Sequence, residues 1–374
     1  MAKGGSVDIF LAGMDSLRMQ RVARRDQQLL LVPTEEGTLR RDHGGITAAA
    51  LVETLPQQYF SPTRTKPVTL SFLGDGARSQ CGIIRATPNL VHLSDNAFLE
   101  VVKTDGSPLA EVGGTTAHVF VESAGLTLLS AAREIQKSVR HERLTRNAAL
   151  VRLSGFLMEL CGSYARDPLH PSEGEVLYDL PPLTTVTEVR EFLQEARSLH
   201  GLELARLAAG YANDGSGSSM ETLWYHAFCL PPRLGGLHLA RPLQNTPLAW
   251  PPEVRDLVKH KTMRPDFFWD QYRVACEHQG KDHASESALS EDCDRARDYE
   301  LCDIAYLPVS KKDARSEESV RAFLAQLVEK VAPRECPAFR RRMQHHLEDP
   351  GVIAARRVML SQLRPAWRTQ EADA

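Results

Sequence analysis

Four polar residues surround a short apolar stretch in the segment RPDFFWDQYRVACEHQGKDH, which spans residues 264–283. Asp266 precedes this stretch, and Glu277, His278 and Gln279 follow it. If the stretch is a strand, Glu277 and Gln279 project from one face and His278 from the other, because side chains alternate along a strand. The separation between Asp266 and Glu277 leaves room for two strands and a turn, so their carboxylates can meet.

Two carboxylates that meet at the edge of a sheet form a site of hard oxygen ligands, which suits Mg²⁺ or Mn²⁺. Such an ion can polarise a phosphodiester and activate water. The sequence therefore predicts metal-assisted hydrolysis at Asp266 and Glu277. Because two acids without a cation repel each other, we expect removal of either one to leave the melting temperature unchanged or to raise it.

The residues of this site also carry a family resemblance. Asp266, the triplet Glu277-His278-Gln279 and Glu221 at an upstream helix start resemble the PD-(D/E)XK nuclease superfamily, and the segment ACEHQGKDH is similar to its very-short-patch-repair-like branch. The resemblance covers about residues 215–330. It implies an α/β domain of restriction-endonuclease type, with a central mixed sheet flanked by helices, that cleaves DNA as a metal-dependent endonuclease.

The resemblance assigns a role to each of these residues. Asp266 and Glu277 would hold Mg²⁺ or Mn²⁺ together with the main-chain carbonyl of His278, and Glu221 would be the helix acid. Gln279 would be catalytic, at a position where much of the superfamily has lysine. A neutral amide can orient water but carries no positive charge. This departure favours an alternative function, a non-catalytic DNA-binding or antitoxin-like regulator that keeps the nuclease fold.

Three further residues are candidates for contact with nucleic acid. Lys281 can supply the charge that Gln279 lacks if the strand continues far enough. His283 is either a site residue of the family type or a surface histidine. Arg297 lies one helical turn after Asp294, and it either contacts a phosphate or forms a solvated ion pair with that acid.

Structural explanations compete with these chemical ones. Ser218 and Glu221 have the spacing of a capping box, which needs the glutamate whether or not a metal binds. Asp266 also suits an ordinary turn into a strand. A zinc site is disfavoured, because strand alternation turns two of its candidates away from Glu277. The four zinc candidates are Cys276, His278, His283 and Cys293.

A second, upstream resemblance covers about residues 115–245. The segments HVFVESAGLTLLSAA, MELCGSY and DGSGSSMETLW look like a region of type IV abortive-infection antitoxin proteins. It implies a defence or toxin–antitoxin context. A protein-interaction scaffold without a nucleic acid partner is the third function that we consider.

The sequence divides into four consecutive segments. Residues 1–125 alternate short apolar runs with Gly, Pro and Asn, which predicts a small mixed or β-rich module. Residues 126–213 have apolar residues at helical spacing and form a helical, antitoxin-like region. Residues 214–332 form the nuclease-like domain, with the order helix, strand, strand, helix, strand, helix. Residues 333–374 form basic helices that could follow a phosphate backbone.

Composition narrows the class of protein. The chain has 374 residues, a formal charge of −3 and a pI near 6.5, so only a local patch could bind nucleic acid. Its seven cysteines lie far apart without a CxxC pair, which predicts reduced thiols. The sequence begins without the pattern of a secretory signal and has no long apolar run. We therefore expect a cytoplasmic protein with no membrane partner.

Overall fold

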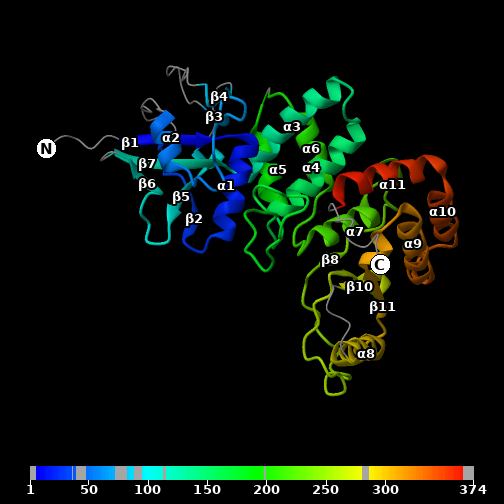
Figure 1. The fold of residues 1–374 in the computed structure, drawn as a ribbon. Coiled ribbons are helices and arrows are strands. Elements are labelled where there is room, and N and C mark those ends of the chain that lie inside the picture. Colours follow the sequence, from blue (N-terminus) through cyan, green and yellow to red (C-terminus); the bar gives the residue numbers. More distant parts are fainter. Residues whose placement is uncertain are drawn as a thin grey trace, which may run out of the picture. The chain divides into compact units, whose positions relative to one another are not determined.

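A computed structural model of the chain describes residues 6–35, 37–38, 48–71, 82–87, 95–112, 115–197, 199–279 and 286–364. The protein is a mixed α/β structure with two compact units (Figure 1). The first unit combines residues 1–141 and 165–209, and the second combines residues 142–164 and 210–365. The units cut across the segments predicted from the sequence, since the chain crosses from one unit to the other within the helical region 126–213.

The first unit is built on a mixed sheet with the order β2-β5-β7-β1-β3-β4, and β6 pairs with β7. The pairs β1–β7 and β3–β4 are parallel, and the other pairs are antiparallel. The strands are β1 (Ser6–Leu11), β2 (Leu29–Pro33), β3 (Val68–Ser71), β4 (Ile84–Thr87), β5 (Phe98–Lys103), β6 (Ala110–Val112) and β7 (Thr115–Glu122).

The central strands β1 and β7 are buried on both faces, which is why each contains a continuous apolar run. Ile9 and Val119 belong to the core on one face, and Phe10 stacks on Phe120 on the other, with 4.5 Å between ring centroids. Helix α1 packs against the sheet and against α3 (Figure 1). The helices of this unit are α1 (Gly13–Arg25), α2 (Ala48–Thr54), α3 (Ala124–Arg140), α5 (Val186–Glu195) and the larger part of α6 (Leu202–Tyr211).

A buried acid joins β7 to α1 and α3. Glu122 is fully buried, and its two carboxyl oxygens accept hydrogen bonds from the Gly13 N–H (2.9 Å) and from the Ser130 hydroxyl (2.7 Å). Burial raises the pKa of Glu122 to about 7, although both hydrogen bonds oppose the shift. The stability of the first unit should therefore depend on pH near neutrality.

We expect the Glu122→Gln variant to lose less stability than the wild type as the pH rises from about 6 to about 8.5. A raised pKa stabilises the fold fully below the unfolded value of 4.5, and that stabilisation is lost as the pH rises through about 7. Over this interval the free energy of unfolding of the wild type falls by about 1–2 kcal/mol. The variant avoids this loss, because glutamine stays neutral. Urea unfolding at several pH values measures this pH dependence of the free energy of unfolding, with the exposed Glu111→Gln as control. If the free energy of unfolding depends on pH equally in the wild type and in Glu122→Gln, the raised pKa of Glu122 is contradicted.

The second unit has a four-stranded sheet with the order β11-β10-β9-β8, in which only the pair β10–β11 is parallel. The order of helices and strands predicted for residues 215–331 is confirmed, and β8 is an additional two-residue strand. The strands are β8 (Leu243–Gln244), β9 (Phe267–Trp269), β10 (Val274–Gln279) and β11 (Ala305–Ser310). The helices are α4 (Arg146–Leu160), α7 (Ser219–Cys229), α8 (Glu286–Leu301), α9 (Glu317–Val331), α10 (Pro337–Glu348) and α11 (Pro350–Leu363).

Strand alternation determines which helix each face of this sheet contacts. Phe267 and Trp269 pack edge-on against Phe228 of α7. Phe268 lies in a separate core cluster with Tyr299 of α8. Because Ala275 belongs to that second cluster, Glu277, two positions further along β10, faces α8 as well.

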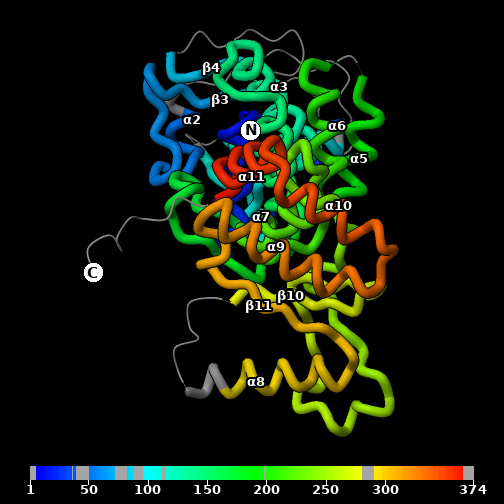
Figure 2. Tube along the Cα trace, turned by 90° about the vertical axis from the view of Figure 1, so that its right-hand side faces the viewer, coloured from blue at the N-terminus to red at the C-terminus, as the bar shows by residue number. Residues whose placement is uncertain are grey.

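The basic C-terminal helices predicted from the sequence are present as α10 and α11, which pack next to α9 (Figure 2). Several of their arginines bond to acids of the same unit. Arg356 is fully buried and pairs with Glu317 at 2.8 Å, and Arg357 pairs with Glu318 at 3.1 Å. Arg340 pairs with Glu329 at 3.0 Å. These ion pairs therefore neutralise part of the positive charge of the C-terminal helices. In the described part of the chain, no helix has the length and apolar character needed to span a membrane.

Candidate functional site

The structure brings Asp266 next to β10. Asp266 lies directly before β9, and its Oδ2 accepts a hydrogen bond from the main-chain N–H of His278 at 2.6 Å. In the antiparallel pair β9–β10, Phe267 is opposite Cys276. Continuing this register by one residue places Asp266 opposite Glu277, as the spacing in the sequence predicted.

Glu221 comes from a third element, the first turn of α7. The Ser218 side chain caps this helix by accepting from the Glu221 N–H at 3.1 Å. The Glu221 carboxylate completes no capping box, because its Oε2 accepts from the Gly217 N–H and from the Asn245 side-chain amide, both at 2.6 Å. The main-chain N–H of Asn245 in turn donates to the carbonyl of Asp266 at 3.3 Å. Asn245 therefore connects Glu221 to Asp266.

The electrostatics of Asp266 show that these acids interact. Burial, together with the negative charges of Glu221 and Glu277, raises the pKa of Asp266 to about 8, although the hydrogen bond from the His278 N–H opposes the shift. Burial also raises the pKa of Glu221, against the hydrogen bonds from Gly217 and Asn245. A cation at this position would replace the proton on Asp266 and relieve the repulsion.

Glu277 already has partners on α8. Its Oε2 pairs with Arg295 at 2.6 Å, and its Oε1 accepts a hydrogen bond from the Tyr299 hydroxyl at 2.5 Å. Burial and the Glu277 charge raise the pKa of Tyr299, so this hydroxyl is a donor at every physiological pH. Glu277 therefore contributes negative charge to the site while both of its oxygens contact α8.

These contacts reverse the expectation from the sequence that removing Glu277 leaves the melting temperature unchanged or raises it. We expect Glu277→Ala to lower the free energy of unfolding by about 2–4 kcal/mol, because it leaves Arg295 and Tyr299 without their acceptor. Glu277→Gln should cost less, since an amide oxygen can still accept from Tyr299. Chemical denaturation measures both, with the exposed Glu253→Ala as control. A Glu277→Ala protein as stable as this control would mean that the ion pair contributes nothing to the fold.

The remaining predicted residues lie in different surroundings. The Gln279 side-chain amide donates to Asp292 of α8 at 3.3 Å. The imidazole of His278 is on the opposite face from Glu277, and burial lowers its pKa, so it is neutral. Arg297 is exposed and pairs with Asp294 at 3.1 Å, which is the ion pair that the sequence allowed. Lys281 and His283 lie outside the described residues.

Arg295, Tyr299 and Asn245 were missed by the sequence analysis. Arg295 and Tyr299 are one helical turn apart on α8, and that spacing was the only local signal that they share a face. Asn245 follows a two-residue strand and has a left-handed backbone with φ of 48°, which asparagine tolerates. No residue near Asn245 in the sequence indicated that it would contact Glu221.

The donor atoms of the site suit a hard cation. Among residues with a described placement, no group of three or more His, Cys, Asp or Glu side chains is arranged around a metal position. Of the four zinc candidates, His283 lies outside the described residues. Mg²⁺ does not need such a group, because it retains several waters and binds through one or two carboxylates. The second oxygen of Asp266, Oδ1, accepts no hydrogen bond from the described residues. Asp266 and Glu221 are therefore the carboxylates best placed to hold Mg²⁺, and Glu277 is the third acid beside them.

Comparison with protein-family models, with curated proteins and with solved structures found no match to this chain.

Proposed function

We propose that the second unit is a metal-dependent endonuclease that hydrolyses phosphodiester bonds of DNA. The observation that carries this proposal is that two acids from other elements, Glu221 and Glu277, lie near enough to Asp266 for their charges to raise its pKa. Asp266 precedes β9 and bonds to the main chain of β10, Glu277 is on β10, and Glu221 on α7 is joined to Asp266 through Asn245. A four-stranded mixed sheet with α7 on one face and α8 on the other supports the restriction-endonuclease-like fold that the resemblance implies.

In this proposal Asp266 and Glu221 would hold Mg²⁺ or Mn²⁺, and the ion would supply Lewis-acid activation of the phosphodiester and of water. Asp266 would hold such an ion in its ionised form. Gln279 projects from the same face of β10 as Glu277 and orients water through its amide. Arg295 holds Glu277 in position from α8.

The test is cleavage of supercoiled plasmid DNA by the full-length protein. We expect nicked DNA with Mg²⁺ or Mn²⁺, and none with EDTA. Absence of nicking on duplex, single-stranded and mismatched DNA with either ion would overturn the proposal.

A second candidate function rests on the contacts of β10 with α8. Because Arg295 and Tyr299 occupy both oxygens of Glu277, and Gln279 bonds to Asp292, the site could be a nuclease fold that binds DNA without turnover. This function predicts a gel shift of DNA that weakens with salt, in a protein that leaves the DNA intact. If the protein neither shifts nor cleaves DNA, the protein-interaction scaffold remains as its function.

A further inference from the structure

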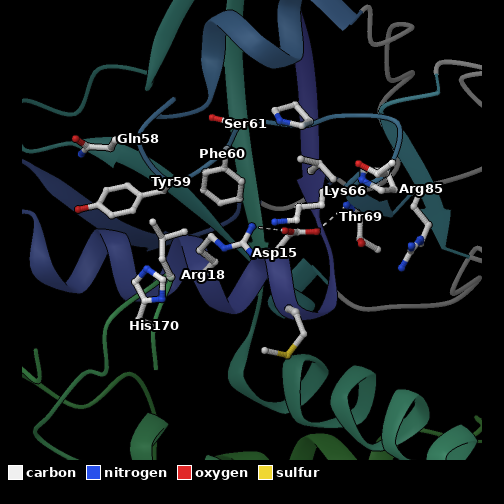
Figure 3. Close-up of a pocket in the computed structure, with 16 residues that line it drawn as sticks. Asp15, Arg18, Gln58, Tyr59, Phe60, Ser61, Lys66, Thr69, Arg85 and His170 are labelled. Atoms are coloured by element: carbon white, nitrogen blue, oxygen red, sulfur yellow. Dashed lines mark hydrogen bonds and ion pairs between the residues drawn. The ribbon is translucent and has the colours of Figure 1, made fainter. Parts of the chain in front are cut away.

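A cavity in the first unit has the size and charge of a ligand site. It has a volume of about 620 Å³, which lies within the usual range for small-molecule pockets. Its walls come from α1, from the segment 58–69 that leads into β3, from β4 and from the loop that contains His170 (Figure 3). All of these elements belong to the same compact unit.

Three positively charged side chains, those of Arg18, Lys66 and Arg85, line this cavity. Lys66 and Arg85 line it, and neither has an acidic partner among the described residues. Arg18 also lines it and pairs at 2.7 Å with Asp15, the one acid among the described residues of the wall. The cavity therefore has unused donors and a net positive charge.

Hydrogen bonds and strand pairing fix the positions of the residues around these cations. One oxygen of Asp15 accepts from Arg18 and the other from the main-chain N–H of Thr69 at 2.8 Å. Thr69 is paired in register with Arg85 across the parallel strands β3 and β4. Asp15 therefore fixes Arg18 and β3 relative to each other.

One side of the cavity is aromatic. Phe60 packs beneath the Arg18 guanidinium, 5.3 Å from its ring centroid, and Tyr59 is half-buried beside it. Figure 3 shows Tyr59 and His170 on one side of Arg18 and Arg85 on the other. A ligand whose anionic group lies next to Lys66 and Arg85 would thus have its organic part near Tyr59.

We propose that this cavity binds a phosphorylated small molecule of nucleotide size, with Arg18, Lys66 and Arg85 contacting the phosphates and Tyr59 packing against the organic part. Arginine suits this role because its planar group donates two parallel hydrogen bonds to a phosphate. A second cavity of about 700 Å³ shares Met14, Thr69 and Arg85 with the first and is lined by Arg133, so the positive potential continues past Arg85.

The experiment is calorimetric titration of the full-length protein with ATP, ADP, pyrophosphate and uncharged adenosine. We expect ATP and ADP to bind more tightly than pyrophosphate, adenosine not to bind, and the affinity for ATP to fall as salt is raised. Arg85→Ala and Lys66→Ala should each weaken ATP binding by about 10- to 100-fold, which is the scale of one charge-assisted hydrogen bond.

Arg197→Ala is the matched control, because Arg197 is an exposed arginine of the same unit that does not line the cavity. It should bind ATP like the wild type. The proposal is overturned if no phosphorylated probe binds, if pyrophosphate binds as tightly as ATP, or if Arg197→Ala loses as much affinity as Arg85→Ala. These outcomes are independent of DNA cleavage by the second unit.

Discussion

Asp266→Asn should reduce Mg²⁺-dependent cleavage of DNA by at least about a thousandfold, because it removes a charged ligand of the cation while leaving the fold intact. Asparagine keeps an oxygen that can accept from the His278 N–H, so the link between β9 and β10 is retained. It also removes the charge that the neighbouring acids repel. We therefore expect its melting temperature at pH 8 to equal or exceed that of the wild type.

The readout is single-turnover cleavage at fixed Mg²⁺ and salt, with melting temperature measured on the same samples. Asp256→Ala is the matched control, since Asp256 is an exposed acid of the same unit. It should retain full activity. An Asp266→Asn protein that cleaves like the wild type would exclude Asp266 as a ligand, and one that unfolds would assign the residue to the fold instead.

Gln279→Ala should lower the cleavage rate by roughly ten- to a thousandfold, the scale expected for losing one oriented polar group near a transition state. Gln279→Lys should retain or raise activity, because an ammonium stabilises the negative charge that develops during hydrolysis. The structure supports a lysine here, since Glu277 and Asp292 flank the position and both are acidic.

The assay for Gln279 is the same single-turnover cleavage, with Asp266→Asn as the blank, so that a contaminating nuclease is not mistaken for this protein. If Gln279→Ala cleaves at the wild-type rate, the amide serves only to bond Asp292 of α8. Absence of activity in wild type and in Gln279→Lys would favour the non-catalytic DNA-binding function.

Local periodicity explains how much of the fold the sequence predicts. The order of elements from α7 to α9 is confirmed, because apolar spacing at 2 and 3.6 residues is a property of consecutive residues. The same argument placed Glu277 on the face of β10 opposite Cys276, which lies in the core. Helices α1 and α2 were not predicted as such, because the frequent Gly, Pro and Asn of the first 125 residues masked two helices among strands.

The sequence by itself determined that Asp266 and Glu277 can meet, since a turn between two strands has few possible registers. Only the tertiary structure decided what each acid contacts. The partners of Glu277 are on α8, and Asn245, which follows β8, bonds to Glu221 on α7, because packing and not chain distance sets such contacts. The same holds for the cavity of the first unit, where Arg18, Lys66 and Arg85 converge from separate elements that no local pattern connects.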